Sequence, residues 1–174
     1  MRRQLIPAAL LTAALSVLAV PQAGAESAVG SQDRMFLTHI HQGNLAEIAA
    51  GHDARRHATT ACVRDAGAVL VRDHSKLDAA GKKLAAKLHV RLPSAPSAKQ
   101  RQQLESVQRK AGSPAYDRAW LTAQDAAHRE TLTLLDKEIR HGRNGEVVAA
   151  ARTARPVVKS HLDMVRGGTC HAAG

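Results

Sequence analysis

Residues 144–168 read NGEVVAAARTARPVVKSHLDMVRGG and predict one long amphipathic helix. Asn144 provides a cap at its start, and Gly167 and Gly168 provide a stop. Pro156 is expected to kink or loosen the helix without ending it, because the apolar spacing continues beyond it. One helical face carries Val147, Ala151, Ala154, Val158, His161 and Val165. The stretch therefore predicts a helix that turns one histidine toward an apolar core.

The rest of the chain is rich in Ala, Leu, Arg, Lys and Gln and is punctuated by capping residues, which favours helices over strands. We expect three more long helices and one short helix. The short helix follows a connector at 90–98 and runs from about Ala98 to a stop at Gly112. The long helices are expected at about Gln32–His57 with Ser31 as N-cap, from Thr59 or Thr60 to about His89, and from Pro114 to Gly142 with Ser113 as N-cap.

The N-terminal residues predict export. Arg2 and Arg3 precede an apolar run over 5–20, and the small residues Ala23-Gly24-Ala25 follow it. We expect a signal peptide at 1–25, a helical bundle at 26–168 and a C-terminal tail at 169–174. The alternative is an uncleaved helix that is amphipathic or anchors the chain in a membrane. No second apolar stretch of that length follows, so we expect no transmembrane segment after cleavage and an extracellular, periplasmic or cell-envelope location.

The charge of the mature chain predicts a solvated surface. Cleavage lowers the basic count from 25 to 23 against 15 acidic residues, a formal charge of +8, and the two signs alternate along the sequence. The three aromatic residues, Phe36, Tyr116 and Trp120, form no stacking array, so we expect no nucleic-acid partner. The sequence names no protein partner.

The fold class we predict is all-α: a ferritin-like four-helix bundle with a long crossover that carries the short helix between the second and third long helices. Two cysteines in an oxidising compartment usually bridge, so we expect a Cys62–Cys170 disulfide, with two free thiols as the alternative. In strictly alternating helices the ends that carry these cysteines would lie on the order of 35–40 Å apart. A connector that runs back along the bundle brings them together.

Each long helix carries one polar residue near the middle of its apolar face: Glu47, His74, His128 and His161. A buried carboxylate without partners is costly, and imidazoles and carboxylates are common ligands of transition metals in bundle cores. We therefore expect these four residues to bind one ion of iron, manganese, zinc or copper. The alternative is a structural network in which Glu47 pairs with a protonated histidine. The other seven histidines are expected to be surface residues or incidental metal contacts.

The spacing around these histidines favours a single ion. Proteins with two bridged irons place a glutamate three residues before the histidine on two helices. Here Val71 and Val158 stand three residues before His74 and His161, and only His128 is preceded by an acid at that interval. We expect Asp73 or Asp125 to orient the imidazoles by hydrogen bonds instead.

Several motifs occur in a fixed order along the chain: Asp33-Arg34-x-Phe36, Gly43-Asn44-Leu45-Ala46-Glu47-Ile48, Val71-Arg72-Asp73-His74-Ser75, Tyr116-Asp117-Arg118-Ala119-Trp120-Leu121 with His128, and Pro156-Val157-Val158-Lys159-Ser160-His161-Leu162. Together they resemble the secreted ferritin-like bundle family of unknown function whose members are often labelled predicted outer-membrane proteins. The resemblance implies a four-helix fold, an exported location and the same four polar positions, but no activity.

Motifs of enzymatic chemistry are absent from the sequence, which has no nucleophile elbow and no glycine-rich phosphate loop. The leading hypothesis is an exported bundle that binds one metal ion. The alternative is a non-catalytic envelope or interaction protein with a buried polar network and no metal.

Overall fold

The structure, a computed structural model, describes residues 29–171, so the expected signal peptide at 1–25 lies outside the described residues. Every regular element between residues 29 and 171 is helical, which confirms the predicted all-α class. The elements are α1 (Ser31–His57), α2 (Ala61–Lys87), α3 (Ala98–Gln108), α4 (Pro114–His141), α5 (Gly145–Val165) and a short 3-10 turn, η1 (Arg166–Gly168). Within the described range, no helix combines the length and the apolar character needed to cross a membrane.

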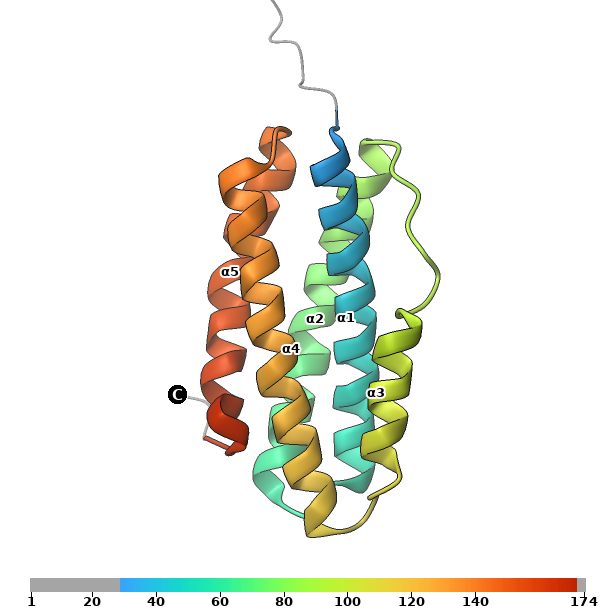
Figure 1. The fold of residues 1–174 in the computed structure, drawn as a ribbon, viewed down its shortest axis with the longest axis vertical. Helices are drawn as coiled ribbons and strands as arrows, with labels where there is room; N and C mark the ends of the chain where they lie inside the picture. The colour runs from blue at the N-terminus through green and yellow to red at the C-terminus, as the bar shows by residue number, and fades with distance from the viewer. Residues whose placement is uncertain (1–28, 172–174) are drawn as a thin grey trace, which may run out of the picture.

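The four long helices lie side by side around a common interior (Figure 1). Helix α1 packs against α2 and α4, and α5 packs against the same two helices, so each long helix has two neighbours. The connector at 88–113 runs back along the outside, where α3 packs against α1 and α4. As a result α4 starts at the same end of the molecule as α2, and α5 finishes toward that end.

Local backbone chemistry sets the helix ends, and several of them differ from the sequence prediction. Ser31 is not the N-cap of α1 but its first residue, because Gly30 takes the cap position and its backbone amide donates to the Asp33 carboxylate at 2.8 Å. Helix α2 ends at Lys87 rather than His89, because His89 adopts a left-handed backbone with φ of 54°. Helix α3 ends at Gln108, and Gly112, with φ of 70°, lies in the following turn. Asn144 caps α5 as expected, since its Oδ1 accepts hydrogen bonds from two backbone amides of the first turn at 3.1 and 3.2 Å. Helix α5 continues through Pro156 as one element.

Helices α1 and α2 approach closely at a pair of glycines. A Cβ atom on Gly51 would lie 2.5 Å from the carbonyl oxygen of Gly67 and 2.8 Å from the Val71 side chain. A Cβ on Gly67 would lie 2.8 Å from the carbonyl oxygen of Gly51. Glycine at both positions therefore lets the two backbones meet, and the first two long helices form the most closely packed pair.

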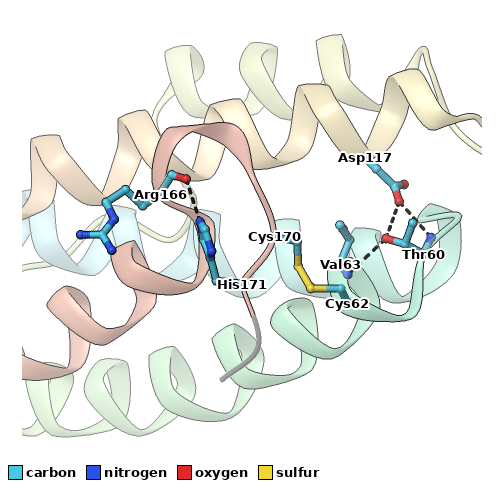
Figure 2. The surroundings of a disulfide bond; sticks show 7 residues. All are labelled: Thr60, Cys62, Val63, Asp117, Arg166, Cys170 and His171. Atoms are coloured by element: carbon cyan, nitrogen blue, oxygen red, sulfur yellow. Dashed lines mark hydrogen bonds between the residues drawn. A yellow bond between two sulfur atoms is a disulfide. The ribbon is translucent and has the colours of Figure 1, made fainter. Parts of the chain in front are cut away.

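Cys62, in the first turn of α2, and Cys170, after η1, form a disulfide with their Cα atoms 6.2 Å apart (Figure 2). The same end of the molecule is tied by Asp117 of α4, which accepts hydrogen bonds from the backbone amides of Thr59 and Thr60 at 2.8 and 2.9 Å. Beyond the disulfide, the backbone amide of His171 donates to the carbonyl of Met164. Cys170 and His171, which follow η1, are therefore fixed to α2 and α5.

Candidate metal site

The apolar interior divides into two clusters, one at each end of the long helices. One is built around Leu70 and Trp120, and the other around Phe36 and Leu135. Along each of α2, α4 and α5, one histidine falls between residues of the two clusters. These residues, His74, His128 and His161, are 3 %, 1 % and 1 % exposed and are called the three-histidine cluster below.

The three-histidine cluster draws its members together from three helices. Each residue offers one ring nitrogen, and these nitrogens all lie within 4.8 Å of one another. The ring centroids are 5.0 Å apart for His74 and His161, 5.5 Å for His128 and His161, and 5.8 Å for His74 and His128. The rings are tilted or edge-on to one another rather than stacked, an arrangement that lets all three nitrogens approach a common point.

Each imidazole is oriented by a hydrogen bond from one of its nitrogens to an oxygen acceptor. His74 Nδ1 bonds to Oδ1 of Asn44 at 2.9 Å, and His128 Nδ1 bonds to the carbonyl oxygen of Gln124 at 2.8 Å. His161 Nε2 bonds to a carboxylate oxygen of Asp73 at 3.1 Å. Because all three partners are acceptors, these nitrogens carry the proton, and the opposite nitrogen of each neutral ring keeps its lone pair.

The nitrogens that keep their lone pairs have no partner. His74 Nε2, His128 Nε2 and His161 Nδ1 are buried and accept no hydrogen bond. Leaving a buried polar atom unpaired costs roughly 1–3 kcal/mol, so three in one place call for an explanation. These are the atoms through which an imidazole coordinates a metal ion, and the outer hydrogen bonds are those that usually fix a metal-binding histidine.

The environment keeps all three rings neutral. Burial lowers the pKa of His74 well below its usual value, and the neighbouring His128 and His161 lower it further. Burial lowers the pKa of His128 to about 4 and also lowers the pKa of His161, although Asp73 opposes the shift at His161. Neutral imidazole is the form that binds metals, so the cluster needs no deprotonation at neutral pH.

Glu47 on α1 is buried but is not a member of this close group. It stands three residues after Asn44, so the two lie on the same face of α1, and Asn44 contacts His74. The Oε2 atom of Glu47 has no hydrogen-bond partner, and burial alone raises its pKa to about 8. Burial is the one cause of this shift, and no neighbouring positive charge contributes to it.

Of the two aspartates expected to orient imidazoles, only Asp73 does so. The carboxylate of Asp125 instead binds Arg129, one helical turn away, and the backbone amide of Gly167. The sequence analysis missed the two groups that orient the other rings. Asn44 could have been found from its position one turn before Glu47, whereas the carbonyl of Gln124 carries no side-chain signal.

The expectation that the other histidines lie at the surface is wrong for His41. Its side chain is buried, with Nδ1 bonded to Asp78 of α2 at 2.6 Å and Nε2 bonded to the carbonyl of Pro93 at 2.9 Å. Both nitrogens of this ring are therefore satisfied. His41 joins α1, α2 and the connector, and it shows how this chain builds a histidine with a purely structural role.

The fold and the site define an all-helical protein with a buried, oriented group of three imidazoles. The chain belongs to a family described as a domain of unknown function, DUF4142, whose model matches residues 18–167. Its fold is similar to that in the crystal structure of a DUF305 fragment from Deinococcus radiodurans, with a TM-score of 0.69, 12 % identity, and coverage of 80 % of this chain and 95 % of that chain. At this identity the similarity concerns the fold alone. A comparison with curated proteins gives no match.

Proposed function

We propose that this protein binds one transition-metal ion between α2, α4 and α5 through His74, His128 and His161. The observation that carries the proposal is the pattern of paired and unpaired nitrogens. Each ring has one nitrogen hydrogen-bonded to an oxygen acceptor, and the other is buried without a partner. Iron, manganese, zinc and copper all accept imidazole ligands, so the ligand set fits each of them.

A structural polar network is the rival explanation, and it fits the three-histidine cluster poorly. In a structural polar network, the buried polar atoms form hydrogen bonds with one another. His41 is an example, because both of its ring nitrogens have hydrogen-bond partners. The three clustered rings share no hydrogen bond, and each leaves one nitrogen unpaired. A bound ion would satisfy all three atoms at once.

Glu47 is the residue best placed to complete the ligand set from the fourth long helix. Its unpaired, buried oxygen lies on the face of α1 that already contacts the cluster through Asn44. Three neutral imidazoles and one carboxylate would leave a divalent ion with a charge of +1, which is easier to bury than +2. Metal binding would replace the proton that burial holds on this carboxyl group.

The arrangement of the long helices is further proposed to be a ferritin-like four-helix bundle, at 26–168, preceded by a signal peptide at 1–25. The long connector and the polar site between the helices support this assignment. The disulfide is compatible with an exported location, where thiols are oxidised. The physiological use of the ion can be storage, sensing or redox chemistry.

Calorimetric titration of the untagged, oxidised protein with Zn²⁺, Co²⁺ and Cu²⁺ tests the proposal. We expect about one ion per chain for the wild type and loss of that binding in His161→Ala, because the substitution removes one imidazole ligand. The matched control is His39→Ala, which removes an exposed histidine of α1 and should bind as the wild type does. A wild type that takes up no ion, or equal binding by both variants, contradicts the proposal.

A further inference from the structure

A small cleft reaches the interior at the level of the proposed metal site. It has a volume of about 40 Å³ and lies between α1, α3 and α4. Its α1 wall is formed by Ala46 and Ala50, which flank Glu47 in the helix, and its α4 wall includes Ala127, the residue before His128. A water molecule needs roughly 10–15 Å³, so the cleft has room for about three or four. Small side chains thus leave an opening beside the two helices that carry these candidate ligands.

One polar group in this cleft has no partner. The side chain of Gln124 lines the cleft, is 4 % exposed, and leaves its Oε1 atom buried without a hydrogen bond. The same residue provides the backbone carbonyl that orients His128. A neutral amide oxygen suits brief contact with a metal ion, because it is a weaker ligand than imidazole or carboxylate. Gln124 therefore lies on the boundary between the cleft and the three-histidine cluster.

Helix α3 covers the cleft and is loosely attached along its length. Val107 is its only buried residue, and Gln100 and Leu104 are the half-buried residues through which it contacts the cleft. A second, open groove runs along the other side of α3, between α3 and α4. The firm attachments are at its C-terminal end, where Gln108 donates to Asp53 at 2.9 Å. At the other end, Lys99 forms an exposed ion pair with Glu130 of α4 at 3.8 Å, and such pairs contribute little. The cover is therefore held firmly at one end and packs lightly over the opening.

We infer that the α3 cleft is the entrance to the metal site, with α3 as its cover and the Gln124 amide oxygen as the first protein ligand that a divalent transition-metal ion meets. The inference rests on the proposed function, and it adds a route and a rate-controlling element to it. An entrance changes how fast an ion enters and leaves, but the final ligands alone set the equilibrium affinity. Narrowing the entrance therefore slows both steps together.

Stopped-flow absorption with Co²⁺ measures both rates in the oxidised protein, since the visible bands of Co²⁺ intensify on entering a four-coordinate site. In Ala46→Leu, three extra carbon atoms narrow the cleft, and we expect association and dissociation to slow by about tenfold each, equivalent to a barrier raised by about 1.4 kcal/mol. Leu104→Ala thins the cover, so both rates should rise. The dissociation constant should stay within experimental error in both variants.

The control is Ala80→Leu, which makes the same change at an exposed position of α2 and should leave both rates unchanged. Gln124→Met keeps the side-chain length but removes the amide oxygen, and it should slow association. An unchanged association rate in Gln124→Met overturns the role of that oxygen. Unchanged rates in both Ala46→Leu and Leu104→Ala overturn the entrance. If the wild type binds no Co²⁺ at equilibrium, it is the proposed function that fails.

Discussion

His161 is held by a carboxylate, whereas His74 and His128 are held by neutral oxygens. A carboxylate on the outer nitrogen increases the electron density on the inner one and makes the ring a stronger ligand. The carboxylate of Asp73 also bonds to Arg72, and this hydrogen bond is the main reason that the pKa of Asp73 lies well below its usual range. Asp73 therefore stays charged at any pH at which the imidazoles can bind a metal.

Asp73→Asn should weaken metal binding by ~10–100-fold while leaving about one site per chain, because the ring loses its charged partner but remains in place. Competition against a chelator of known affinity measures the change. Asp125→Asn is the matched control, because the two carboxylates are similarly exposed, at 18 % and 19 %, and each binds an arginine. Equal weakening in the two variants would show a general charge effect and would remove the positioning role of Asp73.

The lowered pKa values of the cluster predict that the metal-free protein loses stability in mild acid. In the native state His128 stays neutral until the pH falls to about 4, whereas in the unfolded chain it takes up a proton near 6.5. The unfolded state therefore binds more protons between these values, and the free energy of unfolding decreases as the pH falls. Urea unfolding in the presence of a chelator measures this effect. Between pH 7 and pH 5, the free energy of unfolding should decrease by up to about 2 kcal/mol less in His128→Gln than in the wild type. An equal decrease in the free energy of unfolding in both proteins would contradict the lowered pKa of His128.

The raised pKa of Glu47 predicts the opposite effect of pH on the stability of the metal-free protein. Its native carboxyl group keeps a proton up to about pH 8, whereas the unfolded chain releases it near 4.5. Stability from this group is complete below 4.5 and is lost as the pH rises through 8. In the metal-free protein, Glu47→Gln should therefore gain stability relative to the wild type as the pH rises from 5 to 8, by at most about 1.4 kcal/mol per unit. A constant difference across this range would mean that the carboxylate finds a partner when ionised.

The sequence predicted which helices would supply inward-facing polar residues, but not which groups would orient them. His74, His128 and His161 are buried as predicted, because the inward face of a helix follows from the residue spacing within that helix alone. Orientation depends on rotamers and on neighbouring helices, so Asp125 was assigned a role that the carbonyl of Gln124 fills. His41 was missed for the same reason, since its partners belong to α2 and the connector.

At the scale of helices, the contact between α1 and α2 depends on the absence of two Cβ atoms. Gly51→Ala should lower the free energy of unfolding by ~1–3 kcal/mol, because the added methyl meets backbone and the Val71 side chain. Gly43→Ala on the same helix has no atom within 4 Å of the new Cβ and should be neutral or stabilising by up to ~1 kcal/mol through helix propensity alone. Thermal unfolding of the two variants separates packing from propensity. A stabilised Gly51→Ala would show that the helices can move apart at no cost.

The starts of α4 and α5 were predicted more closely than the ends of α2 and α3. Asn144 and the Ser113-Pro114 pair mark the starts of α5 and α4 within a residue. The end of α2 was placed two residues late, because the left-handed conformation of His89 is imposed by the turn and leaves no pattern in the sequence. Gly112 was predicted to stop α3, but the helix ends four residues before it, at Gln108.

For the whole molecule, the Cys62–Cys170 disulfide closes a loop across a sequence separation of 108 residues. In the chain-entropy model such a loop stabilises the folded state by up to ~4–5 kcal/mol. Replacing both cysteines with serine should lower the urea midpoint of unfolding accordingly, and the reduced wild type should match the double variant. If neither change moves the midpoint, the two ends are held together by the neighbouring non-covalent contacts alone.

The disulfide joins the second helix in chain order to a residue that follows the fifth. Synthesis of every helix must therefore precede its oxidation, and the bond has no part in choosing which helices pair first. When it forms after the helices have packed, it adds to an assembly that burial and hydrogen bonding already hold together. A cross-link that forms after the transition state of folding leaves the rate of folding unchanged and slows unfolding. A bond formed in this way slows the loss of the folded state, and with it the separation of the three imidazoles.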